Sequence, residues 1–172
     1  MGYQVFVLDY PGYGKSGGKI TDETALFEDV TAAYDSVCRW VPEKDVIALG
    51  YSLGTGLATR LASVRQPRQL LLHAPYYNFK AMMRHRFPFV PTFLLRYDMK
   101  TNEYLPACRM PIVIFHGDAD EVIPLEMGRQ LRMLGKTGDS LVVLKGQGHM
   151  EISETQHYRT ILASILASDI SD

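Results

Sequence analysis

The sequence predicts an α/β fold, in which a mostly parallel sheet of about five strands lies between layers of helices. Short apolar runs rich in Val, Ile and Leu alternate along the chain with longer segments whose apolar residues recur every three or four positions. The chain has 172 residues, of which 47% are hydrophobic and 22% are charged, as is typical of one globular domain. We therefore expect a single domain over residues 1–172 with one core.

Two strand–helix units are predicted in the first part of the chain. Residues 3–8 form a short apolar run that stops at a Pro-Gly turn, which predicts a buried strand. Apolar residues then recur at helical spacing over residues 26–41, with Asp22 in place to cap the helix. Residues 46–51 predict the second strand. Residues 54–65 predict a helix whose small residues allow it to pack closely on the sheet.

Three further apolar runs predict the remaining strands. They cover residues 69–74, 112–116 and 140–145, and each has the length of a strand buried in a parallel sheet. A helix is predicted between the last two strands, over residues 125–134. A closing helix is predicted from the apolar face formed by Tyr158, Ile161, Leu162, Ile165 and Leu166.

The segment from residue 76 to residue 109 interrupts this alternation. It is far longer than the connections elsewhere in the chain, and such segments usually have a function of their own. We predict that it forms a small lid, whose large apolar residues either line an acyl pocket or pack on the body of the protein. These residues are Phe79, Met82, Met83, Phe87, Phe89, Phe93, Leu94 and Leu95.

The charge and cysteine content exclude several classes of protein. The net charge is −1, so the chain has no basic surface for nucleic acid or for an anionic membrane. No apolar stretch is long enough to span a membrane, and no charged leader precedes the first apolar run. The two cysteines, Cys38 and Cys108, have neither zinc-site spacing nor the density of a disulfide scaffold. We expect two free thiols in a cytoplasmic protein.

The loop over residues 12–17 resembles two nucleotide-binding motifs without meeting their requirements. Its glycines match a dinucleotide-binding turn, and Gly14-Lys15-Ser16 matches the end of a phosphate-binding loop. However, Asp9 stands where a phosphate-binding loop needs glycine, and its carboxylate would repel a phosphate. The next helix is predicted to begin after residue 21, too late to present its N-terminus to phosphate groups. The sequence therefore argues against a nucleotide cofactor.

The strongest chemical signal is Gly50-Tyr51-Ser52-Leu53-Gly54, at the predicted junction of a strand and a helix. A serine on such a sharp turn has its hydroxyl exposed above the sheet, and glycines two residues away on either side prevent clashes between strand and helix. A serine hydroxyl is a poor nucleophile, so a base must accept its proton and a third group must orient that base. Ser52 is the predicted nucleophile.

Two later strand ends supply candidates for these partners. Asp118 and Asp120 follow the strand at 112–116, and His149 follows the strand at 140–145. Because ligand groups in open α/β sheets gather at the carboxyl ends of strands, Ser52, one of these acids and His149 are expected to converge. The other four histidines lie elsewhere and are expected to anchor loops or face solvent: His73, His85, His116 and His157.

Together these motifs resemble the small, lid-poor esterases and thioesterases of the α/β-hydrolase superfamily. The resemblance rests on the stretch from residue 9 to residue 16, the Gly-Tyr-Ser-Leu-Gly motif, the His-Gly-Asp-Ala-Asp stretch and Gly-Gln-Gly-His, and it covers nearly the whole chain. It implies a three-layer fold, a catalytic set of Ser52, Asp120 and His149, and no metal or cofactor. In the family pattern the acid is the fourth residue after the histidine, which selects Asp120 over Asp118.

The resemblance also implies parts that this sequence lacks. The family has strands before the one predicted at residues 3–8, and a loop among them supplies one of two oxyanion-hole amides. Leu53 can supply the other amide. Either Met1 opens a truncated copy of a longer hydrolase, or the first strand pairs directly with residues 46–51 and the amide of Gly12 or Tyr13 replaces the missing donor. An exposed strand edge would also favour a homodimer.

The predicted function is two-step hydrolysis of a small carboxylic ester or thioester. We expect the substrate to lie against Tyr10, Tyr13, Tyr51, Tyr76, Phe79 and Met83. The alternative is a catalytically weak or inactive hydrolase-like interaction protein that lacks a complete oxyanion hole. A lyase or perhydrolase that uses the same three residues is a further alternative. Labelling of the serine by a fluorophosphonate separates the active from the inactive forms.

Overall fold

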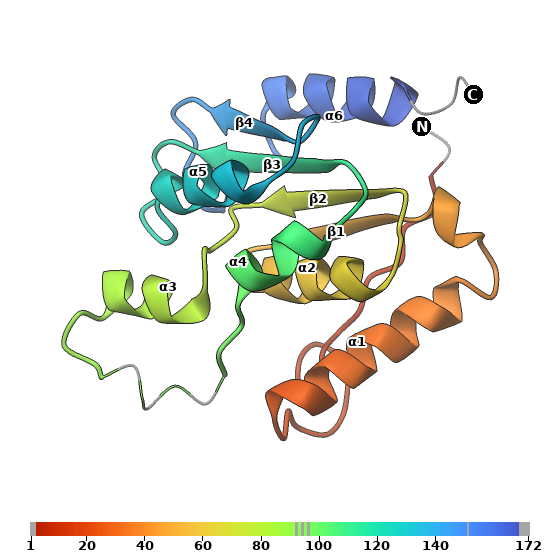
Figure 1. Cartoon of the computed structure of the whole chain (residues 1–172), viewed down its shortest axis with the longest axis horizontal. Helices are drawn as coiled ribbons and strands as arrows, with labels where there is room; N and C mark the ends of the chain where they lie inside the picture. Colours follow the sequence, from red (N-terminus) through yellow and green to blue (C-terminus); the bar gives the residue numbers. More distant parts are fainter. Residues whose placement is uncertain (1–2, 92, 94, 96, 151, 169–172) are drawn as a thin grey trace.

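The computed structural model describes residues 3–91, 93, 95, 97–150 and 152–168 (Figure 1). Its centre is a parallel sheet of four strands in the order β1-β2-β3-β4. The strands are β1 (Ile47–Tyr51), β2 (Gln69–His73), β3 (Ile112–Gly117) and β4 (Ser140–Leu144). The helices are α1 (Glu23–Val37), α2 (Gly54–Val64), α3 (Phe79–Arg86), α4 (Thr101–Tyr104), α5 (Leu125–Leu134) and α6 (Gln156–Ser168), with the short 3-10 turns η1 (Glu43–Asp45) and η3 (Leu105–Ala107).

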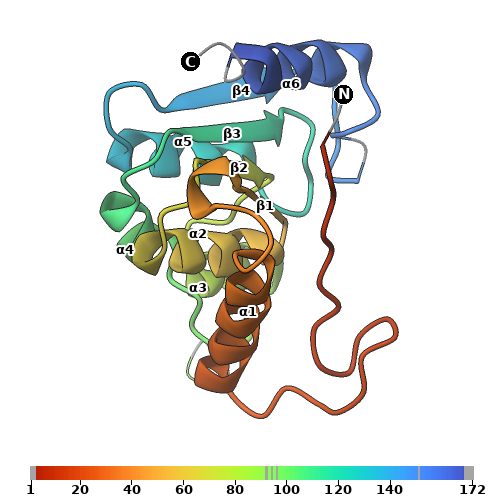
Figure 2. The same cartoon turned by 90° about the vertical axis from the view of Figure 1, so that its right-hand side faces the viewer.

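The sheet lies between two helical layers, as the three-layer prediction requires. Helices α2 and α5 cover one face, with α1 outside α2, and α6 covers the other face (Figures 1 and 2). The two central strands, β2 and β3, are buried along their whole length because helices cover both of their faces. On the outer strands, Leu49 of β1 and Val143 of β4 are exposed. The face toward α2 and α5 buries Leu70, Leu72, Ile112 and Ile114, and the face toward α6 buries Leu71, Val113 and Phe115.

Local signals in the sequence account for the elements beside the site. Asp22 caps α1, where its carboxylate accepts a hydrogen bond from the Ala25 amide. Gly50 lets β1 approach α2 closely, because a Cβ built at this position would lie 2.7 Å from the Gly54 carbonyl oxygen and 2.7 Å from the Thr55 Cα. The close contact fixes the turn between Gly50 and Gly54.

The strand predicted over residues 3–8 is wrong. The segment forms no strand in the described part of the chain, and β1 pairs with β2 alone, so the sheet has four strands and the predicted pairing with residues 46–51 is absent. Val5, Phe6 and Val7 are 83%, 62% and 79% exposed. Figure 2 shows the N-terminal trace passing beside the sheet. An apolar run predicts burial, but a strand forms only where another strand offers its backbone groups for pairing.

The segment over residues 76–109 divides into residues that pack on the body and residues that face solvent. Residues 79–80 are joined to residues 98–99. The Phe79 amide donates to the Met99 carbonyl oxygen, and Lys80 forms a 2.6 Å ion pair with Asp98. Phe89 and Phe93, between them, are exposed. The lid role of this segment stays a prediction, and Leu94 lies outside the described residues.

Two further features concern the cysteines and the apolar character of the helices. Cys38 is half-buried, Cys108 is buried, and both are free thiols. In the described ranges, no helix has the length and apolar character needed to cross a membrane.

We expect Gly50→Ala to lower the free energy of unfolding by about 1–3 kcal/mol, because the added methyl group meets backbone atoms that cannot move aside. Urea denaturation measures the change. Gly17→Ala is the matched control, since Gly17 has no atom within 4 Å of the added Cβ. Equal stability of the two variants would contradict the close approach of β1 and α2.

We expect His73 to make stability depend on pH. Burial among the rings of Tyr51, Phe115 and Tyr158 lowers the pKa of His73 from 6.5 to about 4. Below the unfolded pKa, the unfolded chain binds a proton that the folded protein does not, so stability falls as pH drops from 6.5 toward 4.

The measurement is urea unfolding of the wild type and of His73→Phe, which keeps an aromatic ring in place. From about pH 7 to about pH 4.5, the wild type should lose about 2 kcal/mol more stability than the variant. Other titrating groups are common to both proteins and cancel in the difference. Parallel loss in both proteins would show that His73 is not a buried neutral imidazole.

Candidate active site

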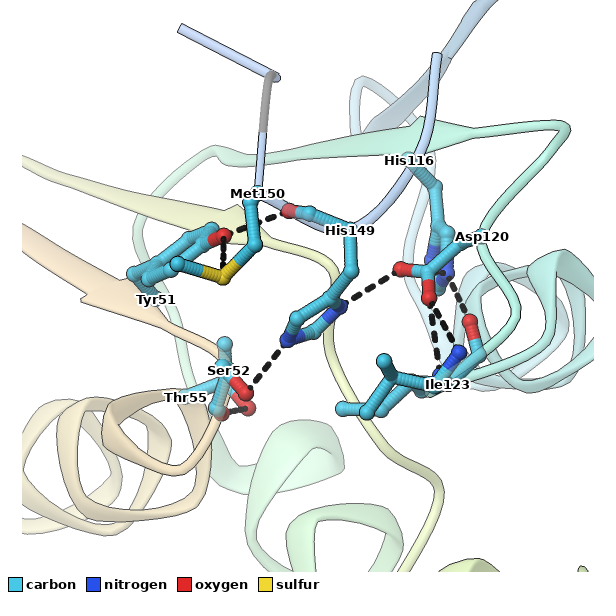
Figure 3. Close-up of polar contacts among 9 residues, drawn as sticks. Tyr51, Ser52, Thr55, His116, Asp120, Ile123, His149 and Met150 are labelled. Atoms are coloured by element: carbon cyan, nitrogen blue, oxygen red, sulfur yellow. Dashed lines mark hydrogen bonds and ion pairs between the residues drawn. The ribbon is translucent and has the colours of Figure 1, made fainter.

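Ser52 lies on a strained turn between β1 and α2. Its backbone φ is 49°, in the left-handed region that a residue with a Cβ rarely adopts. The turn is held in place because the Ser52 amide donates to the His73 carbonyl oxygen at 2.9 Å, and the Thr55 hydroxyl and amide both donate to the Ser52 carbonyl oxygen. Strain and hydrogen bonding together point the serine side chain out of the turn (Figure 3).

Three side chains predicted from the sequence meet at this turn. The imidazole Nε2 of His149 lies 2.9 Å from the Ser52 Oγ, and its Nδ1 lies 2.8 Å from the Asp120 Oδ2 (Figure 3). These residues follow β4, β1 and β3, whose parallel strands end at one edge of the sheet. In the neutral tautomer that this arrangement favours, Nδ1 carries the proton and Nε2 can accept the serine proton.

Asp120 is a buried carboxylate with a full set of donors. One oxygen accepts the amides of Val122 at 2.9 Å and Ile123 at 2.8 Å, and the other contacts His149. Burial alone would raise the pKa of Asp120, but the hydrogen bonds from His149 and from the two amides outweigh it and hold that pKa below its ordinary value. Asp120 is therefore an anion beside the imidazole.

The competing acid, Asp118, has a different environment. Its Oδ1 accepts a hydrogen bond from the Gly146 amide at 2.6 Å, so it ties the loop after β3 to the loop after β4. The same two loops are joined by the Ala119 amide, which donates to the Gln147 carbonyl oxygen. Asp118 thus stabilises the loop that holds His149 without contacting the imidazole.

Tyr51 supports His149, a contact that sequence reasoning missed. Its ring stacks on the imidazole with centroids 5.6 Å apart, and its hydroxyl donates to the His149 carbonyl oxygen at 2.5 Å and contacts the Met150 sulfur at 3.8 Å. The prediction placed Tyr51 against the substrate. The sequence shows an aromatic residue directly before the nucleophile, but it does not show which loop this residue contacts.

The other predicted substrate contacts lie in three different environments. Tyr10 is half-buried, and its hydroxyl lies 3.4 Å from a Cβ built on Gly54, at the nucleophile turn. Tyr13 is exposed on its loop, and Met83 is half-buried on α3. The contacts of Tyr13 and Met83 with substrate stay predictions.

Tyr76 does not fit a substrate pocket. It is fully buried, and its hydroxyl contacts the Leu53 carbonyl oxygen at 3.4 Å and the Met99 sulfur at 3.2 Å. Phe79 packs edge-on against its ring, with centroids 6.0 Å apart. The prediction of a substrate contact is therefore wrong for Tyr76, because this ring fills the space beneath the nucleophile turn.

The predicted replacement donors for an oxyanion hole are occupied within their own loop. The Gly12 amide donates to the Gly17 carbonyl oxygen, and the Tyr13 amide donates to the Tyr10 carbonyl oxygen. Neither amide is available in this structure, so the prediction that Gly12 or Tyr13 supplies the second donor is not supported. The Leu53 amide has no acceptor among the described residues, as an amide that awaits an oxyanion requires.

The hydrogen-bonded series of Ser52, His149 and Asp120 limits which chemistry the site can perform. Within the described part of the chain, no group of three or more His, Cys, Asp or Glu residues is arranged to hold a metal ion. A hydroxyl, an imidazole and a buried carboxylate in series can move a proton from the hydroxyl to the imidazole. Such a set can activate Ser52 for attack on a carbonyl carbon.

Comparison with known families and curated proteins gives consistent matches. A family model described as serine aminopeptidase, S33, matches residues 1–100. The α/β-hydrolase domain-containing protein aho-3 of Caenorhabditis elegans is 31% identical over 169 residues, which are 97% of this chain and 50% of that protein. The lysophosphatidylserine lipase ABHD12 of Danio rerio is 28% identical over 162 residues, 82% of this chain and 42% of that protein. The chain thus spans about half the length of these relatives.

Solved structures match the fold. An esterase of Pyrococcus furiosus superposes with a TM-score of 0.71 at 18% identity, over 95% of this chain and 69% of the other. Est1E of Butyrivibrio proteoclasticus, solved with ferulic acid, superposes with a TM-score of 0.70 at 19% identity, over 95% of this chain and 76% of the other. At this identity the likeness establishes the three-layer fold.

We expect the strain at Ser52 to be measurable without any assay of activity. Ser52→Gly should be more stable to urea than Ser52→Ala by about 1 kcal/mol, because glycine adopts a positive φ without steric penalty. Both variants lose the hydroxyl, so its contact with His149 cancels in the comparison.

Ser63 supplies the matched control, since it lies within α2. There the order should reverse, with Ser63→Gly less stable than Ser63→Ala by about 1 kcal/mol. The same order at both positions would contradict a left-handed Ser52.

Proposed function

The chain belongs to the α/β-hydrolase family described as serine aminopeptidase, S33, and we propose that it is a serine hydrolase that cleaves a carboxylic ester or a thioester through an acyl-enzyme on Ser52. The observation that supports this proposal is the hydrogen-bonded series from the Ser52 hydroxyl through His149 to Asp120. The esterase and lipase names of its relatives agree with an ester as substrate.

In the first step, the Ser52 oxygen attacks the carbonyl carbon of the substrate. His149 accepts the serine proton at Nε2, and the anionic Asp120 stabilises the imidazolium that forms. The tetrahedral intermediate breaks down when His149 returns this proton to the leaving alcohol or thiol. The acyl group is then bound to Ser52 as an ester.

In the second step, water replaces the alcohol or thiol and follows the same route. His149 removes a proton from the water, which attacks the acyl carbon, and then returns the proton to the Ser52 oxygen. The amide of Leu53 and the N-terminal end of α2 stabilise the negative oxygen in both steps.

The alternative is a weak or inactive hydrolase-like interaction protein. It is favoured by the loop hydrogen bonds of Gly12 and Tyr13, which leave Leu53 as the one donor identified in the described residues. Loss of a single oxyanion donor lowers turnover by roughly 10²- to 10³-fold. A site with Leu53 as its single oxyanion donor would therefore turn over slowly and would not have to be inactive.

Three further features belong to the proposal. The segment over residues 76–109 would act as a lid over the acyl group, with Phe79 and Met83 against the substrate. The free thiols of Cys38 and Cys108 favour the cytoplasm as the compartment. Association of two copies through the free edge of β1 stays a prediction.

We expect a fluorophosphonate probe to label the wild-type protein and to leave Ser52→Ala unlabelled. His149→Ala should also abolish labelling, and Asp120→Asn should slow it by about 10³- to 10⁴-fold, because the imidazole loses the group that orients it. His85→Ala is the control, because His85 is an exposed histidine on α3. Intact mass spectrometry measures the fraction of each protein that is labelled.

Turnover then identifies the substrate class. We compare p-nitrophenyl acetate, acyl thioesters and aminoacyl p-nitroanilides, which represent the ester, thioester and aminopeptidase forms of the chemistry. Folded protein that takes up no probe would refute the proposal and favour the interaction protein. Hydrolysis of the nitroanilides alone would replace ester cleavage with peptide cleavage.

A further inference from the structure

His116 is a second histidine beside the carboxylate, and the mechanism above does not use it. Its side chain is fully buried at the end of β3, with Nε2 2.8 Å from the Ile123 carbonyl oxygen and 3.6 Å from the Asp120 Oδ2 (Figure 3). A carbonyl oxygen only accepts hydrogen bonds, so Nε2 must carry the proton of the neutral imidazole. Asp120 thus lies between two histidines, one of which contacts Ser52 and one of which does not.

The other nitrogen of His116 makes the residue an unusual choice for a core position. Nδ1 is buried and has no hydrogen-bond partner among the described residues. It faces α5 at Gly128, where a built Cβ would lie 2.6 Å away. An unpaired buried acceptor destabilises a protein, and an apolar side chain would fill this space without that penalty. The imidazole must therefore supply something that a leucine would not.

What the imidazole supplies is a donor to the turn that aims Asp120. The turn is closed twice at Ile123, whose amide donates to the Asp120 Oδ1 at 2.8 Å and whose carbonyl oxygen accepts from His116. The Ile123 side chain is fully buried and packs in the same cluster as Tyr76 and Met127. Without the His116 donor, the Ile123 peptide unit would lose its anchor to β3.

We propose that His116 is a positioning residue, which fixes the 120–123 turn through the Ile123 carbonyl oxygen and thereby holds the Asp120 carboxylate in line with His149. The inference rests on the proposed hydrolase function. The titratable groups that face His116 are Asp120 and His149, and α5 presents Gly128. Burial lowers the pKa of His116, so the ring stays neutral and does not compete with His149 for the carboxylate.

The first test compares three substitutions with matched shapes. In His116→Gln, the amide nitrogen can take the place of Nε2 and donate to Ile123, so kcat should stay within about threefold of the wild type. His116→Asn has the same amide on a shorter side chain that does not reach Ile123, and His116→Leu has no donor. Both should lower kcat by about 10- to 100-fold with little change in KM, because the carboxylate is misplaced while the acyl site is intact.

The pH profile supplies a readout that general loosening would not change. When Asp120 moves away it stabilises the imidazolium less, so the acidic limb of kcat/KM against pH should move to lower pH in His116→Leu and stay in place in His116→Gln. The control for lost stability is Leu131→Ala, which leaves a cavity at a fully buried position of α5, the helix that packs against His116. This variant should leave the acidic limb unchanged.

A double-mutant cycle separates action through Asp120 from action elsewhere. In an Asp120→Asn background, His116→Leu should lower kcat by less than about twofold further, because the residue that it positions is already impaired. Gly128→Ala gives an independent route, since its methyl group displaces the His116 ring without changing it, and it should shift the limb in the same direction as His116→Leu.

Two results would overturn the proposal. One is a His116→Leu protein with wild-type kcat and an unmoved acidic limb, and the other is full additivity with Asp120→Asn. If His116→Leu does not fold, His116→Asn and Gly128→Ala carry the same test. Fluorophosphonate labelling of the wild type and its absence in Ser52→Ala are established first, so that failure of the hydrolase proposal is seen separately from failure of the role of His116.

Discussion

The direction of the strands is the constraint on which the site depends. Because β1, β3 and β4 run parallel, their carboxyl ends lie at one edge of the sheet, and each is followed by a loop that contributes one of the three side chains. An antiparallel β4 would place His149 at the opposite end of the molecule. Strand direction is what lets residues 97 positions apart in the chain come within 2.9 Å of each other.

Close packing beneath the nucleophile turn makes that edge rigid. Gly50 allows the backbone of α2 to approach β1, and the buried Tyr76 ring supports Leu53 from below. Ser52 keeps a left-handed backbone only because these neighbours leave it no alternative. The strain is held by packing in the apolar core, so the position of the serine hydroxyl depends on residues that never contact it.

Each of the two partner loops is held by groups outside the hydrogen-bonded series. Tyr51 holds the His149 loop through ring stacking and a hydrogen bond to its carbonyl oxygen, and Asp118 joins that loop to the one after β3. Asp120 depends on two backbone amides and on the turn that His116 anchors. A buried anion is tolerated because every one of these contacts either donates to the carboxylate or fixes a group that does.

Apart from the choice of Asp120 over Asp118, which the family resemblance made, the sequence by itself determined the fold class, the limits of most elements to within a few residues, and the meeting of Ser52 and His149 with an acid that follows the third strand. Local patterns are sufficient for these features, since periodicity and turn residues act over a few positions and a parallel α/β sheet has one functional edge. Only the tertiary structure decided that residues 3–8 form no strand, that Tyr76 is buried and that the Gly12 and Tyr13 amides bond within their loop. Each of these features depends on contacts that form only in the folded chain. A local sequence pattern is the same whether or not such a contact forms.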